Sequence, residues 1–437
     1  MHQVSRAALV AALGVAFAAC SDIPVQPDGN QAPSFSQMGA SAPEQVMPGD
    51  VIVKPRAGAD ISAIAGTRGL VVAARGYGGR FFVLRGVAGH EHANAAALRG
   101  DARIQYAEPN YLRQPTVIDS RLWAFYNPGG LNMKYTRGPS SGQFISSSYA
   151  SIADADEDNV EGYAAGGAPI VIGSIDTGVD FAHPELAGRL IAGTDWYNND
   201  IDPTDDNGHG THTTGTMAGQ NVGVAGVAGA AANVMVYVQK VCGKRGCPTA
   251  AIVNAIYAAA DYPGLVAMNL SLGGSSESQA EKDAIAYATA NNVLVIASAG
   301  NSGSGTVACP ACDPNAISVA ATTWRDEKAS YSQYGPGLDI AAPGGNCFSN
   351  TTPEGCIYSS YKGGSYAWLQ GTSMAAPQVT GTSGLVASVT GLRGLALRAR
   401  ILSTADDKGV SGYDQTFGNG RLNSYRAVTG NGLPAGQ

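Results

Sequence analysis

Three side chains that together could perform acyl transfer occur in the order Asp, His, Ser. Asp176 ends the apolar run "IVIGSID", His209 lies in "NGHGTHTTGTMAG", and Ser373 lies in "GTSMAAPQVTG". A serine hydroxyl is a weak nucleophile until an imidazole removes its proton, and a carboxylate fixes the tautomer of that imidazole. The three residues therefore predict nucleophilic catalysis by Ser373, with His209 as the base and Asp176 as its orienting partner.

The two histidines of "HGTH" also permit other interpretations. A zinc hydrolase using His209 and His212 is one of them, but the motif lacks the glutamate that accompanies helical zinc-peptidase histidines, and no third ligand is evident. Taken singly, a lone histidine is more often structural, a strand-end aspartate often forms a turn, and a serine after Gly-Thr often caps a helix. We expect His209 to be the base and His212 to pack or hydrogen bond beneath it.

The elements that must position these residues follow from hydrophobic patterning. From Ala168 to about Thr429, apolar runs such as "NVMVYVQKV", "LVAMNLSL" and "VLVIASAG" alternate with helical patterns such as "TAAIVNAIYAAADY". This alternation predicts an α/β fold with a parallel sheet and helices on both faces. Ligands bind beyond the carboxyl ends of such strands, which is where Asp176 lies. Ser373 is expected where a glycine turn enters a helix, because Pro377 fits a helix only near its start.

The three quoted segments resemble the catalytic blocks of the subtilisin-like serine proteases, whose chain order is Asp, His, Ser. That order differs from those of the α/β-hydrolases and of chymotrypsin. The resemblance runs from about Ile170 to Val428 and implies a subtilisin-like fold. It also implies that Asn301, in "SAGNSG", joins the backbone N–H of Ser373 in stabilising the oxyanion.

The same resemblance implies where a protein or peptide substrate would bind, as an added strand between two walls of a primary specificity pocket. Lys244 and Arg245 would lie near its outer subsites, where they could favour acidic residues or be merely solvated. The expected wall residues are Ser271, Leu272, Gly273, Ser298, Ala299 and Gly300.

We expect no cofactor for catalysis, but a structural calcium ion is one interpretation of the acidic loop "NNDIDPTDDNGHG". Calcium prefers several oxygen ligands on a flexible loop, and some thermostable subtilisin relatives bind it here. Asp200, Asp202 and Asp205 are the candidate ligands, with ordinary polar turns as the equal alternative.

Six of the seven cysteines form three close couples, which predict local disulfides in an exported protein. "CPAC" could instead be a redox or metal motif, although neither a thioredoxin-like context nor a second close Cys/His couple accompanies it. The couples are Cys242 with Cys247, Cys309 with Cys312, and Cys347 with Cys356.

The N-terminus predicts export. A basic lead precedes the apolar run Ala7–Ala19, which has signal-peptide length and is too short to span a bilayer. "FAAC" resembles a lipobox, so Cys20 is the predicted lipidation site; the alternative is cleavage after "AFA", leaving Cys20 as a free thiol. Either way we expect an extracellular or cell-envelope protein of a bacterium, touching the membrane only through that lipid.

Composition shifts divide the chain into a signal peptide (1–19), a tether (20–46), a small α+β domain (47–113), a linker with the start of the mature enzyme (114–167) and a peptidase domain (168–430). The small domain resembles the inhibitory propeptide of subtilisin-like zymogens, cut near Tyr111 to Val117. An unrelated permanent domain is the alternative.

Overall composition limits the partners. The chain has 437 residues, 27 basic against 34 acidic, and no long run of either sign, which argues against nucleic acid. We expect a monomeric serine endopeptidase, secreted or surface-anchored and made as a self-processing zymogen with its propeptide as intramolecular inhibitor. A catalytically silent binding or adhesion lipoprotein on the same scaffold is the alternative; the intact Asp176, His209, Ser373 and Asn301 count against it.

Overall fold

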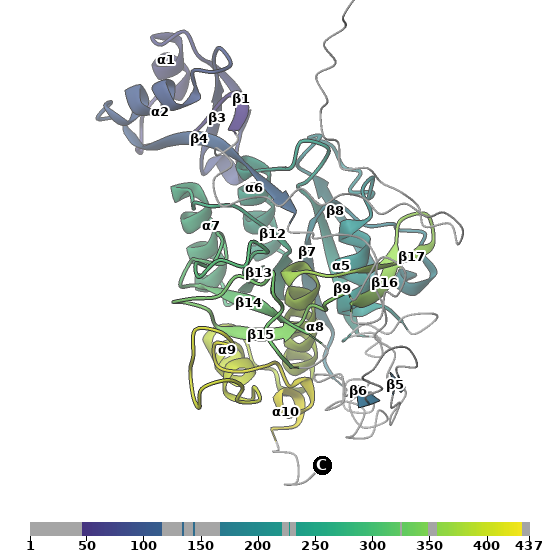
Figure 1. Cartoon of the computed structure of the whole chain (residues 1–437). Coiled ribbons are helices and arrows are strands. Elements are labelled where there is room, and N and C mark those ends of the chain that lie inside the picture. Colours follow the sequence, from purple (N-terminus) through teal and green to yellow (C-terminus); the bar gives the residue numbers. More distant parts are fainter. Residues whose placement is uncertain are drawn as a thin grey trace, which may run out of the picture.

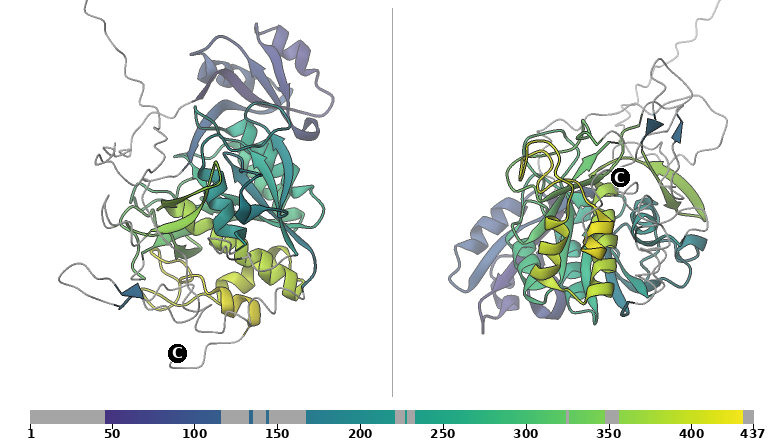
Figure 2. Two further views of the ribbon diagram at one scale, coloured as in Figure 1. Left: turned by 90° about the vertical axis from the view of Figure 1, so that its right-hand side faces the viewer. Right: turned by 90° about the horizontal axis from the view of Figure 1, so that it is seen from below.

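A small antiparallel sheet with two helices forms the N-terminal part of the chain, next to helices α6 and α7 of a larger part (Figures 1 and 2). The computed structural model describes residues 46–115, 133–134, 143–144, 167–220, 227, 233–323, 326–347 and 356–430. The predicted signal peptide, Cys20 and most of the predicted tether and linker lie outside these residues. The elements up to residue 144 are β1 (Val46–Pro55), α1 (Ile61–Gly66), β2 (Val71–Arg75), the 3-10 helix η1 (Tyr77–Gly79), β3 (Phe82–Arg85), α2 (Glu91–Arg99), β4 (Ile104–Pro115), β5 (Met133–Lys134) and β6 (Gln143–Phe144).

The middle of strand β1 in the small sheet is buried on both faces. Side chains alternate between the two faces of a strand, so neighbours on β1 enter different cores. Val51 and Val53 pack with α1 and α2, whereas Ile52 joins a core that contains α6 and α7. One face therefore holds this domain together, and the other attaches it to the larger part.

The larger part contains a seven-stranded sheet in the order β15-β14-β13-β11-β7-β9-β8, in which every neighbouring pair is parallel. Its central strands are buried along almost their whole length, as their continuous apolar runs predict. The strands are β7 (Ile170–Asp176), β8 (Leu190–Asp195), β9 (Val234–Lys240), β10 (Cys247–Pro248), β11 (Leu265–Leu270), β12 (Leu272–Gly273), β13 (Leu294–Ser298), β14 (Ala316–Thr322), β15 (Ile340–Pro343), β16 (Ile357–Tyr361) and β17 (Ser365–Leu369).

Helices cover both faces of this sheet, which confirms the predicted fold class. One core contains residues of α5, α8, α9 and α10, and the other contains α6 and α7. No helix among the described residues is both long and apolar enough to cross a membrane. The helices are the 3-10 helix η2 (Pro184–Leu186), α5 (His209–Ala218), α6 (Thr249–Ala260), α7 (Gln279–Ala290), α8 (Thr372–Thr390), α9 (Gly394–Ser403) and α10 (Ser424–Thr429).

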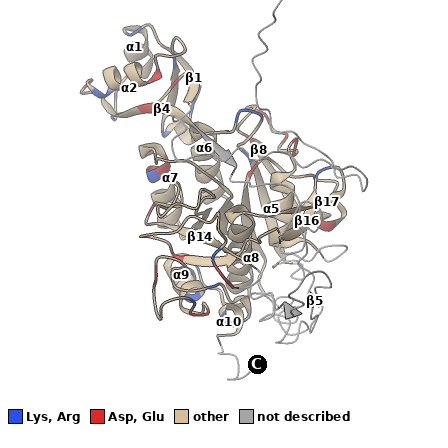
Figure 3. Cartoon of the chain, in the orientation of Figure 1, with Lys and Arg blue, Asp and Glu red and all other residues tan. Residues whose placement is uncertain are grey.

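Charged side chains are spread thinly over the described residues. Figure 3 shows Lys and Arg interspersed with Asp and Glu, without a continuous stretch of either sign. This distribution agrees with the absence of charge runs in the sequence.

Candidate active site

Two glycines let helix α5 approach the end of strand β7. Gly208 has a φ of +113° and lies against the ring of Tyr361, so a side chain at this position would be strained and would clash. A Cβ on Gly210 would lie 2.1 Å from the carbonyl oxygen of Gly178, just beyond the strand end. His209, the first residue of α5, is thereby placed beside Asp176, the last residue of β7.

His209 and Asp176 form a buried pair. Their Nδ1 and Oδ1 atoms are 2.6 Å apart, and each side chain is only 2% exposed. The backbone N–H of Thr177 also donates to Oδ1, at 2.7 Å, and the hydroxyl of Thr213 donates to Oδ2, at 3.2 Å. In the neutral imidazole such a carboxylate favours the tautomer with its proton on Nδ1, in which Nε2 is the acceptor.

The second ring nitrogen of His209 is therefore able to accept a proton. Within the described part of the chain, Nε2 is buried and has no hydrogen-bond partner. Catalytic hydrogen bonds are often loose or absent until substrate binds, so an unengaged Nε2 is compatible with a general base.

Ser373 is the second residue of α8, which packs directly against α5. Its hydroxyl donates to the carbonyl oxygen of Ser271, at 3.4 Å, and the hydroxyl of Ser271 donates to the carbonyl oxygen of Ser373, at 2.8 Å. The predicted nucleophile thus lies in the first turn of a helix, where backbone N–H groups and the helix dipole favour negative charge.

The predicted oxyanion donor Asn301 is held next to the nucleophile by Thr372. Its Oδ1 accepts hydrogen bonds from the backbone N–H and the hydroxyl of Thr372, both at 2.9 Å. Sequence reasoning missed Thr372, Thr177 and Thr213 as positioning residues, although each lies inside a segment quoted for its reactive neighbour.

The predicted substrate walls lie beside the end of strand β4. Leu272 pairs with Pro115 and Gly273 with Gln114, in an antiparallel register. On its other edge, β4 pairs Arg113 with Cys247 in β10. The end of β4 is therefore a strand added between two short edges, of which β12 belongs to the first predicted wall, whereas β10 was not predicted as an edge. The second wall follows β13, where Ser298 and Ala299 are fully buried.

His212 is placed beneath the site. It is completely buried, its Nε2 lies 3.2 Å from the carbonyl oxygen of Ile357, and burial together with the nearby His209 lowers its pKa to about 3. A histidine that stays neutral and bonded to the backbone has a packing role.

The three aspartates proposed as calcium ligands are engaged with the chain itself. Both oxygens of Asp205 accept hydrogen bonds, among them those from the hydroxyls of Thr177 and Thr211. Asp200 and Asp202 each accept a backbone N–H two residues further along, within exposed turns. Among the described residues, no group of three or more His, Cys, Asp or Glu could hold a metal ion. Each of the three carboxylates is thus held by hydrogen bonds from the chain, and calcium binding here stays a prediction.

The three predicted disulfides are present. Cys242–Cys247 crosslinks the loop before α6. Cys309–Cys312 closes a turn near the second wall, and Cys347–Cys356 joins the segments on either side of residues 348–355. Lys244 and Arg245 are exposed at the tip of the first loop, next to the edge that pairs with β4.

Known proteins with similar sequences agree with this site. Residues 167–420 match the sequence model of the subtilase family. The chain is 37% identical over 358 residues to a thermophilic serine proteinase of Bacillus sp. strain AK1, covering 80% of this chain and 78% of that protein. It is 41% identical over 263 residues to thermitase of Thermoactinomyces vulgaris, covering 60% of this chain and 88% of thermitase.

A solved structure shares the fold. Fervidolysin of Fervidobacterium pennivorans, a keratinolytic enzyme related to subtilisin, superposes with a TM-score of 0.70 at 24% identity, covering 89% of this chain and 62% of fervidolysin. The chain thus spans less than two thirds of that protein, and the likeness concerns the fold. Because the family match covers more than half of the sequence, the chain belongs to the subtilase family of serine peptidases.

Proposed function

We propose that this chain is an exported serine endopeptidase that cleaves peptide bonds through Asp176, His209 and Ser373. The observation that carries the proposal is the buried 2.6 Å contact between Asp176 and His209, which leaves Nε2 of the imidazole free to act as a base. Nε2 takes the proton of Ser373 while Oγ attacks the substrate carbonyl. The developing oxyanion is stabilised by the amide of Asn301 and the backbone N–H of Ser373.

The acyl-enzyme then forms and is hydrolysed. The imidazolium of His209 gives its proton to the leaving amine, which breaks the C–N bond and leaves an ester on Ser373. Water attacks that ester with His209 again as the base, releasing the carboxylate product and regenerating the serine. Asp176 stabilises the imidazolium in both halves of the reaction and keeps its own charge.

We further propose that the N-terminal domain is an inhibitory propeptide. Its last strand, β4, runs between β10 and β12, where a substrate would be added. Figure 1 shows β4 running towards β12. Glu108 accepts the first N–H groups of α7, from Gln279 at 2.7 Å and from Ala280 at 2.8 Å. Asn110 similarly accepts the N–H of Ala250 in α6, at 2.9 Å. These contacts cap N–H groups that helices leave without internal partners.

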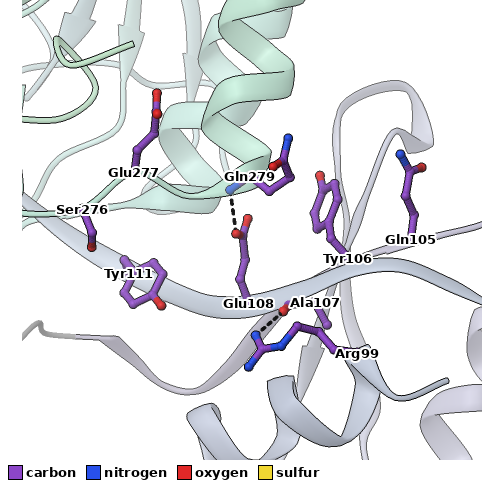
Figure 4. A pocket seen from close by; sticks show the side chains of 9 residues that line it. All are labelled: Arg99, Gln105, Tyr106, Ala107, Glu108, Tyr111, Ser276, Glu277 and Gln279. Carbon is purple, nitrogen blue, oxygen red and sulfur yellow. Dashed lines mark hydrogen bonds between the residues drawn. The ribbon is translucent and has the colours of Figure 1, made fainter.

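The rest of the domain junction combines ionic and aromatic contacts. Lys54 forms a 2.7 Å ion pair with Asp283 on α7, and the guanidinium of Arg80 lies over the rings of Tyr257 and Tyr287. A pocket of about 510 Å³ remains between the two domains beside Glu108 (Figure 4). Ile52, Phe81 and Val83 add apolar contacts to this junction, because they enter the core that contains α6 and α7.

The zymogen proposal also accounts for the N-terminal segment. A lipid on Cys20 would hold the precursor at the membrane, and cleavage after β4 would free the peptidase from it. A start of the mature enzyme shortly after Pro115 is expected, because β4 is paired beside the wall that leads to Ser373.

The test compares the full chain with its Ser373→Ala variant. We expect the parent chain to process itself, to cleave casein, and to lose activity with a phosphonyl fluoride but not with a chelator, whereas the variant stays unprocessed and inactive. Mass spectrometry of the secreted product gives both termini. Casein cleavage by a well-folded Ser373→Ala variant would contradict the mechanism, and a lipidated Cys20 still joined to the active enzyme would contradict release.

The silent binding or adhesion lipoprotein predicts a different result. In that case the parent chain and Ser373→Ala would be equally inactive and equally unprocessed. No observation in the described residues favours it.

A further inference from the structure

A turn closed by the Cys309–Cys312 disulfide connects the two predicted walls of the specificity pocket. Cys309 exchanges two backbone hydrogen bonds with Gly274, at 2.9 and 2.8 Å, directly after the wall that carries Leu272 and Gly273. The preceding Ala308 donates its N–H to the carbonyl oxygen of Ala299 in the second wall, at 2.8 Å. Two consecutive residues of the turn thus bridge segments that approach the substrate from opposite sides.

The turn is close to the second wall and contains few large side chains. A Cβ built on Gly300 would lie 2.9 Å from the Cβ of Ala308, so this part of the turn is in contact with that wall. Cys309 and Ala311 are buried, at 8% and 1% exposure, whereas Cys312 is exposed. The disulfide therefore ties the buried start of the turn to its exposed end, where little packing would otherwise hold it.

We propose that the Cys309–Cys312 disulfide is a specificity-determining element of this peptidase, which fixes the distance between the two walls that flank the substrate residue before the scissile bond. The inference rests on the proposed function, since it assumes that these walls receive that residue. A crosslink removes alternative conformations of the loop that it closes. Without it, the turn keeps its backbone hydrogen bonds, among them the 3.0 Å bond from the N–H of Cys312 to the carbonyl oxygen of Ala308, but loses the covalent link between its ends, so the spacing of the walls is less restricted.

A small change in wall spacing is enough to alter selectivity. One methylene group in a hydrophobic pocket changes the relative rate of two substrates by roughly 10–200-fold, and misplacement by about 1 Å costs up to about 100-fold. Loosening the turn is therefore expected to reduce the discrimination between substrates more than it reduces the intrinsic reactivity of Ser373.

Because Cys312 is an exposed residue, the crosslink is expected to be reducible by a dithiol reagent. The thiolate of the reagent attacks Sγ of Cys312, the disulfide bond breaks, and Cys309 leaves as a thiolate that takes up a proton. The second thiol of the reagent then displaces Cys312 from the mixed disulfide. The cysteines are reduced to two thiols, and the reagent is oxidised to a cyclic disulfide.

The experiment measures kcat/KM for chromogenic peptides that differ only in the residue before the scissile bond. The full chain is expressed and self-processed, with active sites counted by phosphonyl fluoride titration. We expect Cys309→Ala/Cys312→Ala to reduce the ratio between the best and the worst peptide by about tenfold or more. Ratios within twofold of the parent enzyme would overturn the proposal.

Cys242→Ala/Cys247→Ala is the matched control, because it removes a disulfide beside β10 and not between the walls. The overall rates of this control can change, but its ratio of kcat/KM between the best and the worst peptide should not. An equal fall of that ratio in the control would overturn a specific role for Cys309–Cys312.

If the first variant does not fold, the parent enzyme is reduced with dithiothreitol, alkylated, and measured with the same peptides, with mass spectrometry locating the alkylated cysteines. Unchanged ratios in enzyme alkylated at Cys309 and Cys312 would overturn the proposal. A parent chain that cleaves none of the peptides and no casein would instead contradict the proposed function.

Discussion

At the scale of single residues, the two histidines of "HGTH" have opposite environments although they are three positions apart. His209 is paired with a carboxylate, whereas His212 contacts a backbone carbonyl and is held neutral by burial; among the described residues, each keeps one buried ring nitrogen without a hydrogen-bond partner. Sequence distinguished them only through the family pattern, because burial and hydrogen-bond partners depend on segments far along the chain, such as Ile357.

This contrast predicts an asymmetric response to substitution. His209→Ala should reduce kcat by about 10⁴-fold or more with little change in thermal stability, because the base is lost. His212→Ala should mainly lower the melting temperature, since it leaves a cavity and an unpaired carbonyl oxygen on Ile357. Circular dichroism melting and active-site-titrated kinetics distinguish the two. Comparable catalytic loss in two equally stable variants would contradict the assignment.

Asn301 provides a second prediction at this scale. Removing one oxyanion donor from a subtilisin costs about 10²–10³ in kcat, and we expect Asn301→Ala to fall in that range with nearly unchanged KM. The donor acts on charge that exists only in the transition state, so substrate binding should be spared. Ser302→Ala, at the neighbouring position outside the predicted donor set, is the control. A rise in KM without a loss of kcat would mean that Asn301 binds substrate and does not stabilise the oxyanion.

At the scale of elements, the sequence predicted best where hydrophobic patterning was strong. Helix α6 and the buried strands β7, β9, β11 and β13 all correspond to predicted segments. Strands β2 and β8 were missed because they are exposed or half-buried edges, and their sequences "VVAAR" and "LIAGTD" do not alternate clearly.

Contacts between distant elements could not be predicted from the sequence. Glu108 caps a helix whose first residue, Gln279, is 171 positions later, and nothing local in "YAEPNYL" indicates that partner. The triad could be anticipated because its members lie in short motifs of fixed order. The capping of α6 and α7 depends on how two domains dock, which no local pattern encodes.

The capping contact leads to a prediction about domain release. In a Ser373→Ala background, which prevents self-cleavage, Glu108→Ala removes the acceptor for two N–H groups of α7. Loss of a helix cap costs about 0.5–2 kcal/mol, so trypsin should cut the N-terminal domain up to roughly tenfold faster in this variant. Glu327→Ala, an exposed carboxylate on the peptidase domain, is the control. Equal digestion rates in all three proteins would show that the cap does not contribute to docking.

At the scale of the whole molecule, the N-terminal domain completes the burial of the peptidase helices. Ile52, Phe81 and Val83 enter the same core as α6 and α7, and Glu108 and Asn110 cap those helices. The precursor therefore buries more apolar surface and pairs more helix N–H groups than the released peptidase would. This agrees with a domain that assists folding before it is removed. It also means that the stability of the precursor depends on charges next to the junction.

Glu277, which precedes α7 beside the domain junction, carries the last prediction. Burial, followed by the negative charge of Asp313, raises its pKa to about 8. A carboxyl whose pKa is higher in the folded than in the unfolded state takes up its proton more readily when folded, so folding is favoured below about pH 4.5 and progressively loses that advantage between about pH 4.5 and 8. At alkaline pH the charged carboxylate is therefore destabilising, and its 3.4 Å ion pair with Lys282 offsets only part of the cost.

Removing that charge should stabilise the precursor only at high pH. In the Ser373→Ala background, Glu277→Gln should raise the melting temperature by roughly 2–4 °C at pH 9, the shift that about 1 kcal/mol produces in a domain of this size. At pH 4.5 the two proteins should melt within about 1 °C of each other, because Glu277 is then protonated in the folded chain. Glu327→Gln, which replaces an exposed carboxyl, should leave the melting temperature unchanged at both pH values. A stabilisation of equal size at both pH values would mean that packing, and not the charge of Glu277, limits the stability of the junction.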